Sequence, residues 1–151
     1  MKKTILTILV CGVMIFGITG CGTSKIYLAD EEIKYEGIKI IFNSEYRITK
    51  GCSSDFSNNC YEVQIPFEII NTSNKTYDVY ENGPFFDVYT PSGILESAYN
   101  NGYLETLGQV KLKKDASIKD IMKFNVKESG EYTLETTDGK IKISYNIVIP
   151  N

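Results

Sequence analysis

Apolar and polar positions alternate along much of this chain, most clearly between Tyr61 and Asn74. β-Branched and aromatic residues occupy every second position there, and polar residues lie between them. A period of two with these residue types predicts a β-strand with one buried face, closed by the turn-forming residues 71–74. Pro66 cannot donate to a strand ladder, so we expect either an edge position or a bulge at this point. The apolar positions of the strand are Val63, Ile65, Phe67 and Ile69.

The same pattern recurs in shorter stretches on both sides of this strand, with a bulge expected at Gly37. Turn signals separate several of them, such as Thr90–Gly93 and the Asp138-Gly139 pair. About seven to nine short strands predict an all-β fold, an immunoglobulin-like antiparallel β-sandwich over residues 33–151. The expected strands are Ile33–Phe42, Glu45–Thr49, Thr76–Tyr80, Pro84–Thr90, Val110–Lys114, Ser117–Val126, Gly130–Thr136 and Ile141–Ile149.

Residues 1–20 differ from the rest and predict a signal peptide. Met1-Lys2-Lys3 is basic, and the apolar run Thr4–Ile18 is shorter than the ~20 residues that a membrane-spanning helix needs. The next residues, Ile18-Thr19-Gly20-Cys21, resemble the bacterial lipobox. That resemblance implies that Cys21 begins the mature chain and carries fatty acyl chains such as palmitate, which would anchor the protein at the extracytoplasmic face of the cell membrane. The alternative is an ordinary signal peptide with a chance cysteine.

Residues 21–32 are expected to be the lipidated cysteine and a short spacer, which would reach at most ~35 Å. Removal of Lys2 and Lys3 from the 16 basic residues leaves 14 against 19 acidic residues, a net charge of −5. An acidic domain argues against nucleic acid as a partner. It also argues against a protein body that lies flat on anionic lipid.

Two of the four cysteines remain after processing, because Cys11 leaves with the signal peptide and Cys21 takes the lipid. An even pair in an exported chain predicts a disulfide between Cys52 and Cys60. The alternative is a pair of free thiols. Seven residues separate the two cysteines, whereas a redox-active pair is usually two residues apart, so an oxidoreductase is not expected.

Several short motifs follow one another between Glu62 and Thr136. First, an alternating strand ends in Asn71-Thr72-Ser73. A Phe then lies near the start of the next strand, and a Ser-Gly turn follows. After a long loop, the chain has a Leu-containing segment, a strand with Phe near its end and a Tyr-x-Leu strand. In this order they resemble small secreted bacterial lipoproteins with a telokin-like, immunoglobulin-type domain of unknown function. The family often has Pro-Gly where Lys114-Asp115 stands here. The resemblance implies fold and location, and it carries over no catalytic residue. The later motifs are Phe86-Asp87-Val88, Ser92-Gly93, Leu104–Leu112, Ile118–Phe124 and Tyr132-Thr133-Leu134.

The chain contains no histidine, the commonest metal ligand and general base. It also has no phosphate-binding loop and no dinucleotide fingerprint. The acidic run Asp30-Glu31-Glu32 is typical of a solvated segment and lacks the spacing of a calcium loop. We therefore expect no enzyme, no cofactor and no metal site.

Two stretches of unusual composition are candidate binding regions. Thr76–Val110 has five acidic residues, five tyrosines and no Lys or Arg, whereas Lys111–Lys127 has six lysines. Tyr, Asn and Gly are typical of recognition loops, although half-buried strand tyrosines are the alternative. The lysines suggest either a polyanion site or a solvated face. The candidate binding residues are Tyr99, Asn100, Asn101, Tyr103, Lys111, Lys113 and Lys114.

The leading hypothesis is a membrane-anchored, extracytoplasmic, non-catalytic module that binds another protein of the cell envelope. One alternative is a module for cell-wall polymer or glycan, which would use the tyrosine loop or the lysines. Another is an enzyme inhibitor that inserts the loop of residues 53–59 into an active site.

Overall fold

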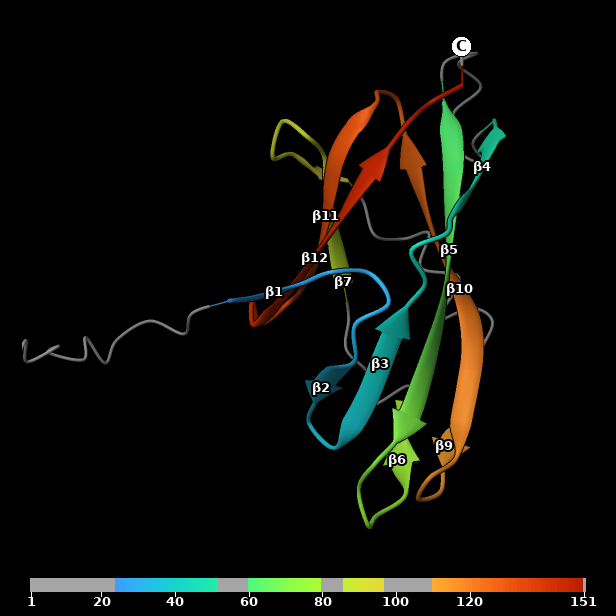
Figure 1. Cartoon of the computed structure of the whole chain (residues 1–151), viewed down its shortest axis with the longest axis vertical. Helices are drawn as coiled ribbons and strands as arrows, with labels where there is room; N and C mark the ends of the chain where they lie inside the picture. Colours follow the sequence, from blue (N-terminus) through green and yellow to red (C-terminus); the bar gives the residue numbers. More distant parts are fainter. Residues whose placement is uncertain (1–23, 52–59, 80–85, 97–109, 151) are drawn as a thin grey trace, which may run out of the picture.

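In the computed structural model the described residues are 24–51, 60–79, 86–96 and 110–150. Their strands form two five-stranded sheets packed face to face and a separate two-stranded ribbon, β6–β9 (Figure 1). Sheet A has the strand order β1-β12-β11-β7-β8, and sheet B has the order β10-β5-β3-β2, with β4 also paired to β5. Neighbouring strands are antiparallel except β1, which runs parallel to β12. The strands are β1 Lys25–Tyr27, β2 Ile33–Tyr35, β3 Ile38–Phe42, β4 Arg47–Lys50, β5 Tyr61–Asn71, β6 Tyr77–Asp78, β7 Phe86–Tyr89, β8 Leu95–Glu96, β9 Lys111–Leu112, β10 Ser117–Val126, β11 Gly130–Thr136 and β12 Ile141–Ile147.

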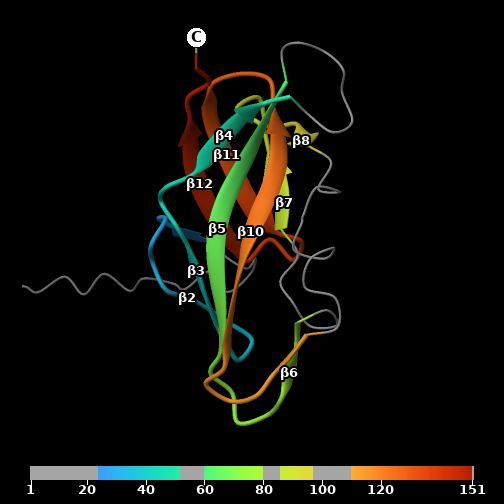
Figure 2. The same cartoon turned by 90° about the vertical axis from the view of Figure 1, so that its right-hand side faces the viewer.

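β5 is the central strand of sheet B, and its alternation places every second side chain in the core, as expected. β10 pairs along its whole length with β5 (Figure 2). On the other side, residues 61–64 of β5 pair with β4 and residues 67–71 pair with β3. The β3 ladder ends where Phe42 faces Phe67, and the β4 ladder begins where Arg47 faces Gln64.

Pro66 therefore lies in an interior strand, at the change of partner from β3 to β4. The Asn43 N–H still donates to the Pro66 carbonyl oxygen at 2.9 Å. The edge position expected for this proline is wrong. The register across β5 moves by two residues at this point, so the extra residues lie in the facing segment 43–46.

Aromatic rings join the two sheets across the core. Phe42 of β3 stacks on Phe67 with ring centroids 5.4 Å apart, and it meets Phe86 of β7 edge-on at 5.2 Å. Phe124 of β10 contacts Tyr132 of β11 at 5.9 Å. Such pairs contribute about 0.5–1.5 kcal/mol beyond the burial of their area. The ring contacts between β3 and β7 and between β10 and β11 hold the two sheets together.

Asn71, the last residue of β5, is 0% exposed and organises the turns at this end of the strand. Its Nδ2 donates to the carbonyl oxygens of Lys75 (2.7 Å) and Leu112 (2.9 Å). Its Oδ1 accepts from the Ser73 N–H and hydroxyl at 2.9 and 2.8 Å. A buried amide with all these partners is fully satisfied, so one side chain connects the turn after β5 with the turn after β9.

Two expectations about the first strands are wrong. Glu36 and Gly37 both have positive φ, 43° and 88°, and they form the two-residue turn of the β2–β3 hairpin instead of a bulge. The segment expected to be a spacer belongs to the fold, because β1 pairs with β12 and Tyr27 is buried in the core. The described domain thus begins at least eight residues earlier than residue 33.

The expected fold class, an all-β immunoglobulin-like sandwich, is confirmed. β5 and β10 share one sheet while β7, β11 and β12 share the other, which is the arrangement of strands B, E and C, F, G in immunoglobulin-type sandwiches. The Tyr132 hydroxyl donates to the Glu128 carbonyl oxygen at 3.0 Å, the bond of a tyrosine corner. The described residues contain twelve strands, more than the seven to nine expected, because several are only two or three residues long.

Candidate functional site

Several residues singled out from the sequence lie outside the described residues. These are Cys21, Cys52 and the loop with Tyr99, Asn100, Asn101 and Tyr103. Cys60 is buried at the start of β5 and is no free thiol. The Cys52–Cys60 disulfide and the tyrosine loop remain predictions.

The candidate lysines differ in their surroundings. Lys111, on the β6–β9 ribbon, has its Nζ 3.5 Å from an Asp78 carboxylate oxygen. Lys113 and Lys114 are exposed in the turn after β9. In this turn Asp115 has a φ of 62°, a left-handed conformation that glycine adopts without strain.

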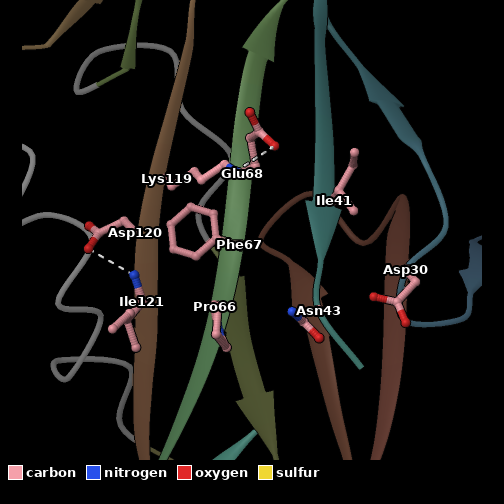
Figure 3. A pocket seen from close by; sticks show the side chains of 9 residues that line it. All are labelled: Asp30, Ile41, Asn43, Pro66, Phe67, Glu68, Lys119, Asp120 and Ile121. Carbon is pink, nitrogen blue, oxygen red and sulfur yellow. Dashed lines mark hydrogen bonds and ion pairs between the residues drawn. The ribbon is translucent and has the colours of Figure 1, made fainter. Parts of the chain in front are cut away.

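The outer face of sheet B contains a depression of about 440 Å³, which we call the sheet B depression (Figure 3). It lies over the change of partner on β5, and side chains of β3, β5 and β10 converge on it. Ile41, Pro66 and Ile121 supply its apolar surface, and Ile121 is 39% exposed. Ile121 faces Pro66 across the β10–β5 ladder, so register places two apolar side chains side by side on a face that meets solvent.

Polar side chains surround this apolar surface. Lys119 on β10 approaches Glu68 on β5, with 4.0 Å between Nζ and a carboxylate oxygen. On the β3 side, Asp30 Oδ1 accepts the Ser44 N–H at 3.0 Å, and hydrogen bonds from Ser44 hold the pKa of Asp30 below its usual value. Asn43 completes the rim beside Asp30.

Asp120 also lines the depression, but its carboxylate points to the side of β10 away from β5 (Figure 3). It occupies a core-facing register position on β10, opposite Phe67, and its Oδ1 accepts the N–H of Ile121 at 2.8 Å. Its Oδ2 is buried and has no hydrogen-bond partner in the part of the chain that the structure describes. Burial therefore raises the pKa of this carboxyl, against the effects of the Ile121 N–H and the Lys123 charge.

The depression combines an apolar surface with polar side chains around it. The three carboxylates beside it have different surroundings. Glu68 pairs with Lys119, Asp30 accepts a hydrogen bond from a loop N–H, and Asp120 lies on the outermost paired strand. Within the described ranges, no three His, Cys, Asp or Glu residues are grouped so that they could hold a metal ion. An apolar surface with a charged rim resembles the core-and-rim anatomy of protein interfaces.

Sequence reasoning missed this site, although one signal was present. Ile41 is apolar in the run Ile40-Ile41-Phe42, and Ile121 is apolar beside Met122. Both therefore break the alternation expected of a strand with one solvated face. An apolar residue out of phase marks a second apolar surface on the outer side of the sheet.

Comparisons with known proteins support the fold. No protein-family model and no curated protein matches this sequence. Among solved structures, the chain is similar to an uncharacterized β-sandwich protein from Clostridium difficile 630, with a TM-score of 0.57 and 12% identity over 85% of this chain and 97% of that one. At this identity the likeness shows the fold alone. Among the described residues, no helix is long and apolar enough to cross a membrane.

Proposed function

We propose that this protein is a lipid-anchored, extracytoplasmic module that binds another envelope protein through the sheet B depression. The observation that carries the proposal is the convergence of Ile41, Pro66 and Ile121 on the outer face of sheet B, within a charged rim. An antiparallel sheet with one face in the core usually places polar residues on its solvent face. Exposed apolar side chains gathered in a hollow are instead typical of contact surfaces.

The lipid anchor supports the same function from the sequence. The basic start, the apolar run and the lipobox-like Ile18-Thr19-Gly20-Cys21 agree in predicting acylation at Cys21. Acyl chains would hold the domain at the membrane, where a partner anchored in the same surface meets it at high effective concentration. Mass spectrometry of the protein extracted from membranes would test this part, since loss of residues 1–20 with acyl chains on Cys21 is expected.

We also propose membership in the telokin-like, immunoglobulin-type lipoprotein family. Two of its motifs have clear structural roles here. Asn71 of the Asn-Thr-Ser motif donates hydrogen bonds to the carbonyl oxygens of Lys75 and Leu112. Thr72 donates its N–H and its hydroxyl to the Gly37 carbonyl oxygen, both at 3.0 Å. Tyr132 of the Tyr-x-Leu motif forms the tyrosine corner.

Photo-crosslinking in the protein's own membranes would test the interaction. A photoreactive residue replaces Ile121 in the lipid-anchored chain, and a matched control replaces Val148, an apolar residue with 61% exposure beyond the end of β12. We expect a discrete adduct with one envelope protein from position 121 and none from position 148. Addition of Ile41→Arg should remove the adduct. Equal labelling from both positions, or none from either, would contradict the proposal.

Binding of wall polymer is the second candidate, supported by Lys113 and Lys114, which are exposed in the turn after β9. The nearby acidic residues Asp78 and Asp115 weaken this case, because they reduce the local excess of positive charge. Attachment to a phosphate polymer would decline steeply from low to physiological salt, whereas an apolar contact at Ile121 would not.

A further inference from the structure

A second exposed apolar surface lies on β1, at the opposite edge of the molecule from β10. Ile26 is 69% exposed and Leu28 is 67% exposed, whereas Tyr27 between them is buried in the core. Successive side chains of an extended segment point to opposite sides, so Ile26 and Leu28 share the outer side of sheet A. We call them the β1 pair. Figure 1 shows β1 along the margin of sheet A, away from the outer face of sheet B.

The position of β1 in the sequence indicates which surface the β1 pair would contact, because β1 lies close to Cys21. Only Gly22, Thr23 and Ser24 separate Cys21 from β1. Four Cα–Cα steps span at most about 15 Å. β1 itself cannot extend the tether, because its parallel pairing with β12 and the buried Tyr27 hold it in the fold.

We infer that the β1 pair inserts into the membrane surface to which Cys21 is anchored, so that the domain is held against the bilayer with sheet A toward the lipid. This inference rests on the proposed lipid anchor. A contact through two side chains is weak alone, but the tether makes it intramolecular and raises the local lipid concentration.

The charges around β1 favour apolar insertion over attraction to anionic headgroups. Lys140 is paired with Glu36 at 3.6 Å and with Asp138 at 2.8 Å, and Lys142 is 2.9 Å from Glu135. The Lys25 Nζ lies 4.4 Å from the centroid of the Tyr27 ring. Asp30, Glu31 and Glu32 are exposed just after Leu28, and a Glu31 carboxylate oxygen accepts the Leu28 N–H at 2.9 Å. Carboxylates therefore outnumber lysines beside the β1 pair, so anionic headgroups should oppose insertion and cannot drive it.

The absence of tryptophan from the chain allows a direct test. Ile26→Trp or Leu28→Trp supplies a single reporter in the full lipid-anchored protein, reconstituted in vesicles of phosphatidylcholine with or without phosphatidylglycerol. Val148→Trp is the matched control, since Val148 is 61% exposed and follows the far end of β12. We expect blue-shifted emission and at least twofold quenching by lipids brominated on the acyl chains at positions 26 and 28, and emission as in water at position 148.

The outcomes separate this inference from the proposed function. If Cys21 carries its acyl chains but reporters at 26 and 28 remain as unquenched as the one at 148, the inference is wrong and the anchor stands. If mass spectrometry finds no lipid on Cys21, the anchor and the inference both fail. If quenching appears only with phosphatidylglycerol and is lost in salt, electrostatic attachment replaces apolar insertion and the inference is wrong.

Discussion

The sheet B depression and the β1 pair contain the same kind of side chain in different settings. In the depression, Ile121 is 39% exposed, recessed between three strands and surrounded by charged groups. On β1, Ile26 is 69% exposed on a three-residue edge strand, close in sequence to Cys21. A hollow with a charged rim fits one partner side chain and discriminates among partners. A protruding pair at an edge fits a fluid surface, which has no shape to match.

The sandwich places the sheet B depression and the β1 pair on different outer faces. The outer faces of two packed sheets point away from each other, and Figure 1 shows β1 and sheet B on opposite sides of the core. If β1 lies on the membrane, the sheet B depression faces the envelope. One fold would then use its two outer faces for attachment and for recognition.

The largest expected effect comes from loss of the core that supports both regions. Phe42 is 1% exposed and contacts a ring in each sheet, so Phe42→Ala should lower the free energy of unfolding by about 3–5 kcal/mol. Urea denaturation measures this change. Ile41→Ala, one residue away on the outer face, is the control and should cost well under half as much. Similar losses for both would contradict the assignment of Phe42 to the core and Ile41 to the outer face.

The next effect separates the regions from each other. Ile121→Arg places a charge on the apolar surface of the depression and should weaken partner capture at least tenfold, which corresponds to about 1.4 kcal/mol. Ile26→Arg should leave capture within twofold and should instead remove bilayer insertion. Quantitative crosslinking measures partner capture by both variants, and brominated-lipid quenching measures their bilayer insertion. Loss of capture in both variants would show that the regions are not independent.

The sequence predicted the parts of this comparison that depend on local pattern. The expected bounds of Ser117–Val126 and Gly130–Thr136 match β10 and β11 to the residue. For Gly130–Thr136 the alternation is a local signal. Ser117–Val126 also fits a helix face in its first half, and the strand is expected there because the neighbouring segments are strands. β1 was missed, since three residues that pair with a strand at the other end of the chain leave no periodicity. The sheet B depression was missed because it requires the register of three strands, which alternation alone does not specify.

Two carboxylates, one near each region, should respond to pH in opposite directions. Asp138 lies in the turn after β11, and its hydrogen bond with Lys140, together with those from Thr136 and Tyr35, holds its pKa well below the ordinary 3.8. A lowered pKa means that the ionised form stabilises the fold at neutral pH. This contribution is lost as pH falls below about 3.8 toward the folded pKa.

Asp138→Asn should therefore lower the free energy of unfolding by about 0.5–1 kcal/mol at pH 7, a value reduced for solvent screening of a partly exposed group. The difference from the wild type should shrink in acid and in high salt. Urea denaturation of both proteins from pH 7 to pH 3 measures it. A difference that stays constant over this range would show that the carboxylate charge does not contribute.

Asp120 should give the smallest effect and the opposite sign. Burial raises its pKa, so the folded protein holds this charge at a cost whenever the pH lies above the folded pKa. Asp120→Asn removes the charge while an amide oxygen can still accept the Ile121 N–H, and we expect a change at pH 7 between none and a gain of about 0.5 kcal/mol.

The gain should disappear as the pH falls to about 3.8, because the wild-type carboxyl is then protonated and no longer bears the cost. Because the Asp120 charge lowers the stability of the fold, its benefit must be of another kind. β10 is the last paired strand of sheet B among the described residues, and a core-facing charge on an edge strand opposes pairing with a further strand. Asp120→Asn should therefore raise light scattering at high protein concentration although it does not weaken the fold. A variant that is both less stable and no more prone to associate would contradict this role.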